Sequence, residues 1–259
     1  MKIVTCYKWV LDDADIRINE RTRELELEKS KPQINEYDLI GIEVGVQLKA
    51  ATGAELVGVS CGTACAASSK DALSRGLDAV FTLDNAAIAN ADSSVTSKLL
   101  AGMIKQQGNA DVIICSEGSS DDYAQQVGPR VAALLGTGCV TYASKVEMTG
   151  DTLRIERKLD DGVEVVEAKT PVLISVVPDI GEAPIPGVKQ ILGAKKKPST
   201  ALSLEEIGMA ADVLEPRVTV SSVKAPVVSR KAQRMNPEGT DLSVAVSNLA
   251  KQLRADGVL

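Results

Sequence analysis

Short apolar runs alternate with segments of helical periodicity through the first 136 residues of the chain. Val112 to Cys115 form one such run, which is typical of a strand buried on both faces of a parallel sheet. Small polar residues interrupt it, and apolar residues then recur at helical spacing up to Gly136. A chain that repeats this unit is expected to form an open, mainly parallel α/β sheet flanked by helices.

The residues before this unit repeat the same order of elements. Strands are predicted at 2–7, 56–60 and 79–83, and helices at 36–53, at 72–76 and from Asp92 onward. Residues 42–48 also alternate like a strand, but the length of the segment favours a helix capped by Asn35. Apolar residues at 16 and 18 and at 25 and 27 predict an antiparallel hairpin appended to the main sheet.

Beyond Gly138 the pattern changes. Apolar residues on both sides of Asp160-Asp161-Gly162 predict a hairpin, and the largely apolar run 172–177 predicts a buried strand. A proline-rich loop, the basic run Lys195 to Lys197, an irregular linker and a helix at 242–253 follow. We expect an α/β domain with appended hairpins over residues 1–200 and an extended C-terminal arm with a helix over residues 201–259.

The loop after residues 112–115 is the best candidate for a ligand site. Ser119, Ser120, Asp121 and Asp122 are expected to cap the first turn of the following helix. In such a unit the free backbone N–H groups at the helix start point to the ligand crevice and favour a phosphate. The domain over residues 1–200 is therefore predicted to bind a nucleotide, and the alternative is a tight turn that binds nothing.

Composition narrows the function classes. The chain has no histidine, which argues against the commonest general base, the Ser-His and Cys-His nucleophile pairs and imidazole metal ligands. Its five cysteines lack Cys-x-x-Cys spacing, so we expect a reducing compartment and neither a zinc site nor a disulfide framework. A net charge of −6 and 2% aromatic residues argue against nucleic-acid binding. No secretion signal and no run of roughly 20 apolar residues is visible, so a cytoplasmic protein is expected.

Four segments together resemble the β subunit of electron transfer flavoproteins. They are Cys6-Tyr7-Lys8, Val59-Ser60-Cys61-Gly62 with Asn35 before it, Asp121-Asp122-Tyr123-Ala124-Gln125-Gln126-Val127-Gly128, and Ile191-Leu192-Gly193-Ala194-Lys195-Lys196-Lys197. The resemblance extends over essentially the whole chain, and the segment from Asp121 to Gly128 is its most specific part. The sequence is most similar to the Fix-type branch of the family.

The resemblance implies an adenine-nucleotide α-hydrolase-like fold and a heterodimer with a flavin-carrying α subunit. It also implies FAD as the redox cofactor, and either AMP or a second FAD held by the β subunit itself. By matching positions, the nucleotide site would be lined by Cys6, Asn35, Asp38, Cys61, Ser119, Asp122, Gln125, Gln126, Val127 and Gly128. Residues 125–127 follow the capped loop closely enough for their backbone N–H groups to face a phosphate. Of the two neighbouring carboxylates we expect Asp122 to face the ligand and Asp121 to cap the helix, because two carboxylates beside a phosphate would repel it. No catalytic side chain is expected, because a flavin would carry the redox chemistry.

The resemblance further implies exchange of electrons between acyl-CoA-type dehydrogenases and a quinone- or ferredoxin-linked acceptor, with bifurcation from NADH as an open possibility. The segment from Glu182 to Ala194 would dock these partners through Val188, Ile191 and Leu192, although Ile191 and Leu192 alternatively pack a short helix onto the core. Val188 departs from the family, where a larger apolar residue is often found.

Two other classes of protein compete with this interpretation. A stand-alone adenine-nucleotide-binding module of the stress-protein type would not need the roughly 120 patterned residues after residue 138. An ATP-cleaving enzyme of the same broad fold would need a phosphate loop after the first strand, where this chain has Cys6-Tyr7-Lys8-Trp9.

Overall fold

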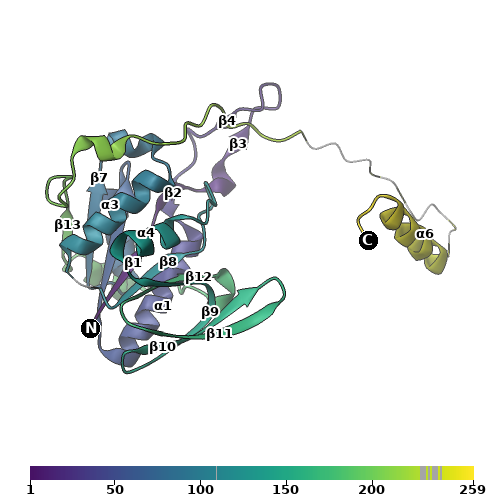
Figure 1. Cartoon of the computed structure of the whole chain (residues 1–259). Helices are drawn as coiled ribbons and strands as arrows, with labels where there is room; N and C mark the ends of the chain where they lie inside the picture. The colour runs from purple at the N-terminus through teal and green to yellow at the C-terminus, as the bar shows by residue number, and fades with distance from the viewer. Residues whose placement is uncertain (109, 228–231, 233, 235–238, 240) are drawn as a thin grey trace.

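The computed structural model describes residues 1–108, 110–227, 232, 234, 239 and 241–259. The strands of the main sheet within them are β1 Lys2–Cys6, β6 Glu55–Gly62, β7 Ala79–Asp84, β8 Val112–Ser116, β9 Gly138–Thr149, β10 Thr152–Leu159, β11 Gly162–Lys169, β12 Val172–Val176 and β13 Ser199–Ala201. Their order across the sheet is β11-β10-β9-β12-β8-β1-β6-β7-β13 (Figure 1). The pairs from β9 to β13 in this order are parallel, and the pairs among β9, β10 and β11 are antiparallel. The predicted mainly parallel α/β sheet is confirmed.

Helices cover both faces of this sheet and enclose two apolar cores. One core packs α1 (Glu36–Thr52) and α2 (Ser69–Ser74) against the sheet, and the other packs α3 (Ser93–Gln106) and α4 (Val127–Leu135) against the opposite face. Figure 1 shows α3 and α4 side by side on their face. The central strands are therefore buried on both sides, which explains why their sequences are continuous apolar runs.

The order of the strands places a change of direction beside β1. The chain lays β6 and then β7 on one side of β1, and it then crosses over to lay β8 and β12 on the other side. In open α/β sheets, ligands bind outside the carboxyl ends of the strands at such a reversal. A ligand site is therefore expected at the edge of the sheet that the carboxyl ends of β1 and β8 form.

Several local expectations are wrong. The hairpin at residues 16–27 exists as β3 (Arg17–Ile18) and β4 (Leu25–Glu26), but it forms a separate two-stranded sheet, as do β2 (Trp9–Leu11) and β5 (Pro32–Ile34). The long strand β9 was not predicted, because its side chains are mostly half-exposed and give a weak apolar pattern.

The helix caps follow the sequence only in part. Asp92 accepts a hydrogen bond from the Val95 N–H and caps α3 as expected. Asn35 lies at the N-cap position of α1, but its side chain does not cap that helix. The α4 helix begins only at Val127, so residues 119–122 belong to the preceding loop and do not cap its first turn. The left-handed Gly136 ends α4 as predicted.

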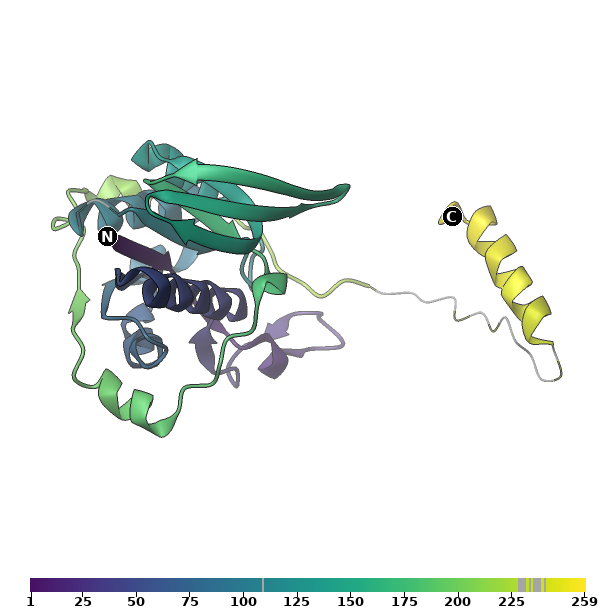
Figure 2. The same cartoon turned by 90° about the horizontal axis from the view of Figure 1, so that it is seen from below.

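The chain after β12 runs around the outside of this body. A short helix, α5 (Val188–Ala194), precedes β13, and the residues that follow place Leu202 and Ile207 in the core beside α3. The C-terminal helix α6 spans Leu242–Ala255, close to the predicted range, and Figures 1 and 2 both draw it away from the sheet. In the part of the chain that the structure describes, no helix is both long and apolar enough to cross a membrane.

Candidate functional site

Polar side chains join the carboxyl ends of β1 and β8 to the start of α1. Asn35 is fully buried, and its side-chain nitrogen donates to the Gly118 carbonyl oxygen at 3.3 Å. Its side-chain oxygen accepts from the Ser120 N–H at 3.1 Å. Asn35 therefore holds the loop that follows β8 instead of capping its own helix, and both amide groups satisfy buried backbone partners.

Asp38 is the second buried polar group of this network. One of its carboxylate oxygens accepts from the Lys8 N–H at 2.8 Å, and the other accepts from the Ser116 hydroxyl at 2.6 Å. Burial raises the pKa of Asp38 to about 6, although the hydrogen bonds from Ser116 and Lys8 favour the charged form. Because both oxygens are engaged within the protein, Asp38 fixes the end of β1 to the end of β8.

An ion pair lies at the outer side of the same edge. The Lys8 Nζ atom is 2.7 Å from Asp121 Oδ2, and the Ser119 hydroxyl donates to Asp121 Oδ1 at 2.7 Å. Burial acts to raise the pKa of Asp121, but the charge of Lys8 and the hydrogen bonds from Lys8 and Ser119 together outweigh this effect, and the pKa lies below its ordinary value. The charge of Asp121 is therefore balanced, whereas Asp122 is exposed and makes no hydrogen bond or ion pair to any residue that the structure describes.

The backbone before α4 forms a concavity of N–H groups. Gln125 is left-handed with φ 56°, and Gln126 is right-handed with φ −113° and ψ −26°. Two consecutive residues of opposite hand turn three successive N–H groups, here those of residues 125, 126 and 127, toward one side, in an arrangement that binds anions. None of these three N–H groups has a partner among the described residues. The sequence-based expectation that they face a phosphate thus fits the backbone geometry.

The first turn of α4 is tied to both the sheet and α3. A Cβ on Gly128 would lie 3.4 Å from Cys115 Cβ and 3.5 Å from Leu173 Cδ2, so the glycine lets the helix approach β8 and β12 closely. The Gln126 side-chain oxygen accepts from the Ser93 hydroxyl at 2.9 Å and from Arg130 at 3.0 Å. Its amide nitrogen donates to no residue that the structure describes and is therefore left as a further donor.

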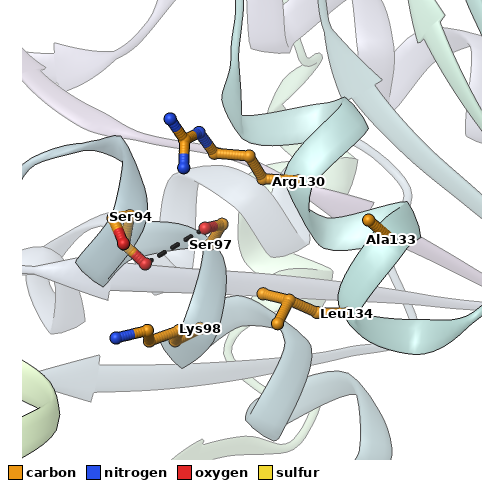
Figure 3. A pocket seen from close by; sticks show the side chains of 6 residues that line it. All are labelled: Ser94, Ser97, Lys98, Arg130, Ala133 and Leu134. Atoms are coloured by element: carbon orange, nitrogen blue, oxygen red, sulfur yellow. Dashed lines mark hydrogen bonds between the residues drawn. The ribbon is translucent and has the colours of Figure 1, made fainter.

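A surface hollow of about 220 Å³ adjoins these residues. Figure 3 shows that Ser94, Ser97 and Lys98 come from α3, whereas Arg130, Ala133 and Leu134 come from α4. The hollow lies in the groove between the two helices and not at the edge between β1 and β8. We therefore place the candidate site at the sheet edge, where one loop carries both the contacts of the buried Asn35 and the unpaired N–H groups.

A family model described as the electron transfer flavoprotein domain matches residues 25–207. The matched range is most of the body just described, including α1, the loop after β8 and α4. The chain belongs to the electron transfer flavoprotein domain family. Members of this family generally bind FAD or AMP and function with an α subunit and with dehydrogenases.

In this electron transfer flavoprotein domain, the two cysteines expected at the site lie on neighbouring strands. Cys6 and Cys61 are both buried in the core between the sheet and the α3–α4 layer. A hydrogen bond with Cys115, followed by burial, raises the pKa of Cys6, and burial raises the pKa of Cys61 to about 12. Both thiols are therefore protonated and unreactive at neutral pH. Any contact with a ligand would come from the backbone at these strand ends.

The expected docking residues of the domain lie elsewhere, on α5. Val188, Ile191 and Leu192 are 74%, 51% and 56% exposed, so the alternative in which Ile191 and Leu192 pack the helix onto the core is wrong. Ala194 is the buried residue of this helix. Lys197, the last residue of the basic run, is half-buried, and its Nζ donates to the carbonyl oxygens of Leu73 and Leu77 near the end of α2.

Some residues of the site could not be recognised in the sequence. Ser116 and Glu117 end a strand and look like ordinary turn residues, yet Ser116 binds Asp38 and Glu117 binds the Tyr123 hydroxyl. Tyr37 lies in the first turn of α1, and its ring is 5.6 Å from that of Tyr123. The sequence offered one signal, which was that aromatic residues are scarce. The chain has four tyrosines, and two of them contact each other at this place.

Proposed function

We propose that this chain is the β subunit of a Fix-type electron transfer flavoprotein and binds an adenine nucleotide at the edge between β1 and β8. The observation that carries the proposal is the concavity of unpaired N–H groups at residues 125–127, which belongs to the same loop that Asn35 binds at Gly118 and Ser120. Such a concavity at the start of a helix stabilises a phosphate by hydrogen bonds and by the helix dipole.

The residues fit either an AMP or a FAD in this place. The phosphate would bind to the N–H groups of residues 125–127 and to the Gln126 amide. Lys8 binds Asp121 in the same loop and would share its positive charge with the ligand. Asn35, Asp38 and Ser119 would hold the surrounding backbone, and the ends of β1 and β6 at Cys6 and Cys61 would border the ribose and base. A bound FAD would supply the redox chemistry, and the protein would supply position and electrostatics.

The chain would work with a flavin-carrying α subunit. The segment after residue 215 exposes a series of apolar side chains, which are Val218, Val220, Val223, Val227, Leu242, Val244, Val246 and Leu249. Apolar surface of this extent is normally covered in an assembly. We assign the arm and α6 to contact with the α subunit, so that electrons pass between acyl-CoA-type dehydrogenases and a quinone- or ferredoxin-linked acceptor.

The bound nucleotides test this proposal. The chain is produced together with its α subunit, and FAD and AMP are released with acid and counted per heterodimer. We expect two FAD, as in the bifurcating form that accepts a hydride from NADH. One FAD with one AMP, and no NADH oxidation, would assign the chain to the one-flavin class. A chain that remains monomeric and holds neither nucleotide would contradict the proposal, and a monomer with AMP alone would favour the stand-alone module.

A variant in the concavity locates the nucleotide. We expect Gln126→Ala to release the nucleotide on dialysis, because it removes the side-chain donor and also the acceptor for Ser93 and Arg130. The matched control is Gln47→Ala, which removes an exposed glutamine of α1. Among the described residues its side chain bonds only to Glu43 of the same helix. Full nucleotide content in the Gln126 variant would place the site elsewhere.

Docking of the dehydrogenase is assigned to α5. Val188 is largely exposed, so Val188→Ala loses no packing in the subunit and its melting temperature should stay unchanged. A valine side chain buried by a partner contributes about 1.5 to 3 kcal/mol, so electron transfer from a cognate acyl-CoA dehydrogenase should fall roughly tenfold. Unchanged transfer, at unchanged flavin content, would remove the docking role.

A further inference from the structure

Tyr123 has a backbone conformation that a tyrosine rarely adopts. Its φ is 44°, in the left-handed region, where the Cβ of an L-residue crowds the following carbonyl oxygen. Two residues later Gln125 is left-handed as well, and it opens the concavity of N–H groups. A conformation of this kind persists in a loop only where the surroundings hold it in place.

Four contacts hold Tyr123. Its N–H donates to the Ser119 carbonyl oxygen at 2.9 Å, and its hydroxyl donates to Glu117 Oε1 at 2.7 Å. Its ring lies against Tyr37, with the two rings tilted by 55°. The ring also covers Gly118, where an added Cβ would lie only 2.6 Å from Tyr123 Cδ2. The loop is thus folded onto itself at 117–119 and attached to α1 through Tyr37.

These contacts act on the same loop that Asn35 holds from below. Asn35 binds the backbone of Gly118 and Ser120, which precede Tyr123 in the chain. The concavity at residues 125–127 lies on the other side of Tyr123, and no hydrogen bond from its N–H groups fixes it among the described residues. Tyr123 is the residue that connects the held part of the loop to the unheld concavity.

We propose that Tyr123 is a positioning residue for the anion-binding concavity, and that Tyr37, Glu117 and Gly118 form the seat for its ring. The ring keeps the backbone left-handed at Tyr123, which directs the chain through Ala124 into Gln125 and Gln126, the pair of opposite hand that aims three N–H groups at one phosphate. The proposal deepens the nucleotide site argued above and rests on it for the identity of the ligand.

The test uses the full-length chain and two measurements. The first is hydrogen exchange of the amides in residues 117–127 without nucleotide. The second is the dissociation rate of a fluorescent AMP analogue. For Tyr123→Ala we expect exchange at the Ser120 amide and release of the analogue to become about tenfold faster. Tyr123→Phe keeps the ring contacts and loses the bond to Glu117, so its release should be at most about threefold faster. Gly118→Ala displaces the ring and should resemble Tyr123→Ala.

The control is Tyr142→Ala, which removes another left-handed tyrosine, with φ 61°, from β9. This variant should leave both rates unchanged. Unaltered exchange and release in Tyr123→Ala, or equally fast release in Tyr142→Ala, would overturn the proposal. If the wild type binds no AMP analogue, that result counts against the proposed nucleotide site. Faster exchange in Tyr123→Ala would then still support the role of Tyr123 in positioning the loop.

Discussion

Asp38 is the residue at which burial and hydrogen bonding oppose each other most clearly. Its two oxygens bind the Lys8 N–H and the Ser116 hydroxyl, but burial still raises its pKa to about 6. The folded protein therefore binds this proton more tightly than the unfolded chain, in which an aspartate titrates near pH 3.9. Between about pH 4 and pH 6, unfolding releases the proton from the Asp38 carboxyl group. The contribution of Asp38 to the free energy of unfolding therefore decreases as the pH rises through this range, and it is constant above pH 6.

This sign gives a measurable outcome. Two pKa units correspond to roughly 3 kcal/mol, so the free energy of unfolding should decrease by up to that amount across the window through Asp38 alone. Urea denaturation from pH 4.5 to 7.5 should show this decrease in the wild type and a flatter profile in Asp38→Asn. A carboxyl resonance that titrates near pH 6 and is missing in the variant would identify the group. Identical profiles for the two proteins would contradict the assignment.

The ion pair between Lys8 and Asp121 gives a second prediction for a single residue. In Lys8→Met the carboxylate of Asp121 loses its partner, and its unbalanced charge would repel the phosphate of the proposed nucleotide. Loss of a charged hydrogen bond costs about 1.5 to 3 kcal/mol, so nucleotide affinity should fall by a factor on the order of ten to one hundred. Asp121→Asn in the same chain should restore part of the affinity. The control is Lys145→Met, whose exposed pair with Glu147 lies on β9, and equal losses in both variants would exclude a local role.

Several residues of the candidate site were expected from the sequence, but their hydrogen-bond partners were not. Asn35, Asp38 and residues 125–127 were expected there by resemblance, and the strand-loop-helix pattern predicted a phosphate at the start of the helix. That Asn35 binds the loop after β8 could not be inferred, because the two segments are about 85 residues apart and meet only when β1 and β8 pair. The cap expected at residues 119–122 failed because the loop continues to Gln126, held by tyrosine contacts that no local pattern encodes.

At the scale of elements, the agreement follows the depth of burial. The parallel strands β1, β6, β7, β8 and β12 were predicted, because a strand buried on both faces needs an unbroken apolar sequence. The strand β9 and the separation of the β3–β4 hairpin from the main sheet were not, because strands with half-exposed side chains carry little apolar periodicity. Pairing of such strands is decided by distant parts of the chain.

The glycines in the sheet allow a test of this packing. Gly58 lies in the middle of β6, and a Cβ there would be 2.5 Å from Leu77 Cδ1 and 3.1 Å from Tyr7 Cε1. We expect Gly58→Ala to destabilise the fold by about 1 to 3 kcal/mol, because a methyl group must displace a packed core. Gly138→Ala in β9 is the control, since its Cβ would meet only Val172 at 3.7 Å. Equal melting temperatures for both variants would mean that the core around Leu77 yields without cost.

At the scale of the whole molecule, the chain divides into a body that is complete in itself and a segment that is not. The body buries two cores against the two faces of the sheet, and the residues up to Leu214 still pack beside α3. The expected boundary at residue 200 stays a prediction, but these contacts favour an arm that begins after Leu214. The proposed nucleotide site therefore lies in the body, and we assign the arm to the proposed partner.

The α6 helix gives the sharpest test of that division. Leu242, Val246 and Leu249 recur at helical spacing and are exposed, as in a helix with one apolar face whose partner is another protein. In the triple variant with serine at these positions, the melting temperature of the isolated chain should not change, because these side chains bury nothing in it. Assembly with the α subunit should be lost, since burial of each side chain would contribute about 1.5 to 3 kcal/mol. Gel filtration of the co-produced subunits measures this, and serine at Asn248, Lys251 and Arg254 on the same helix is the control. Normal heterodimers in the apolar triple variant would exclude α6 from the interface, and loss of assembly in both variants would mean that helix formation, and not the apolar face, is what the partner requires.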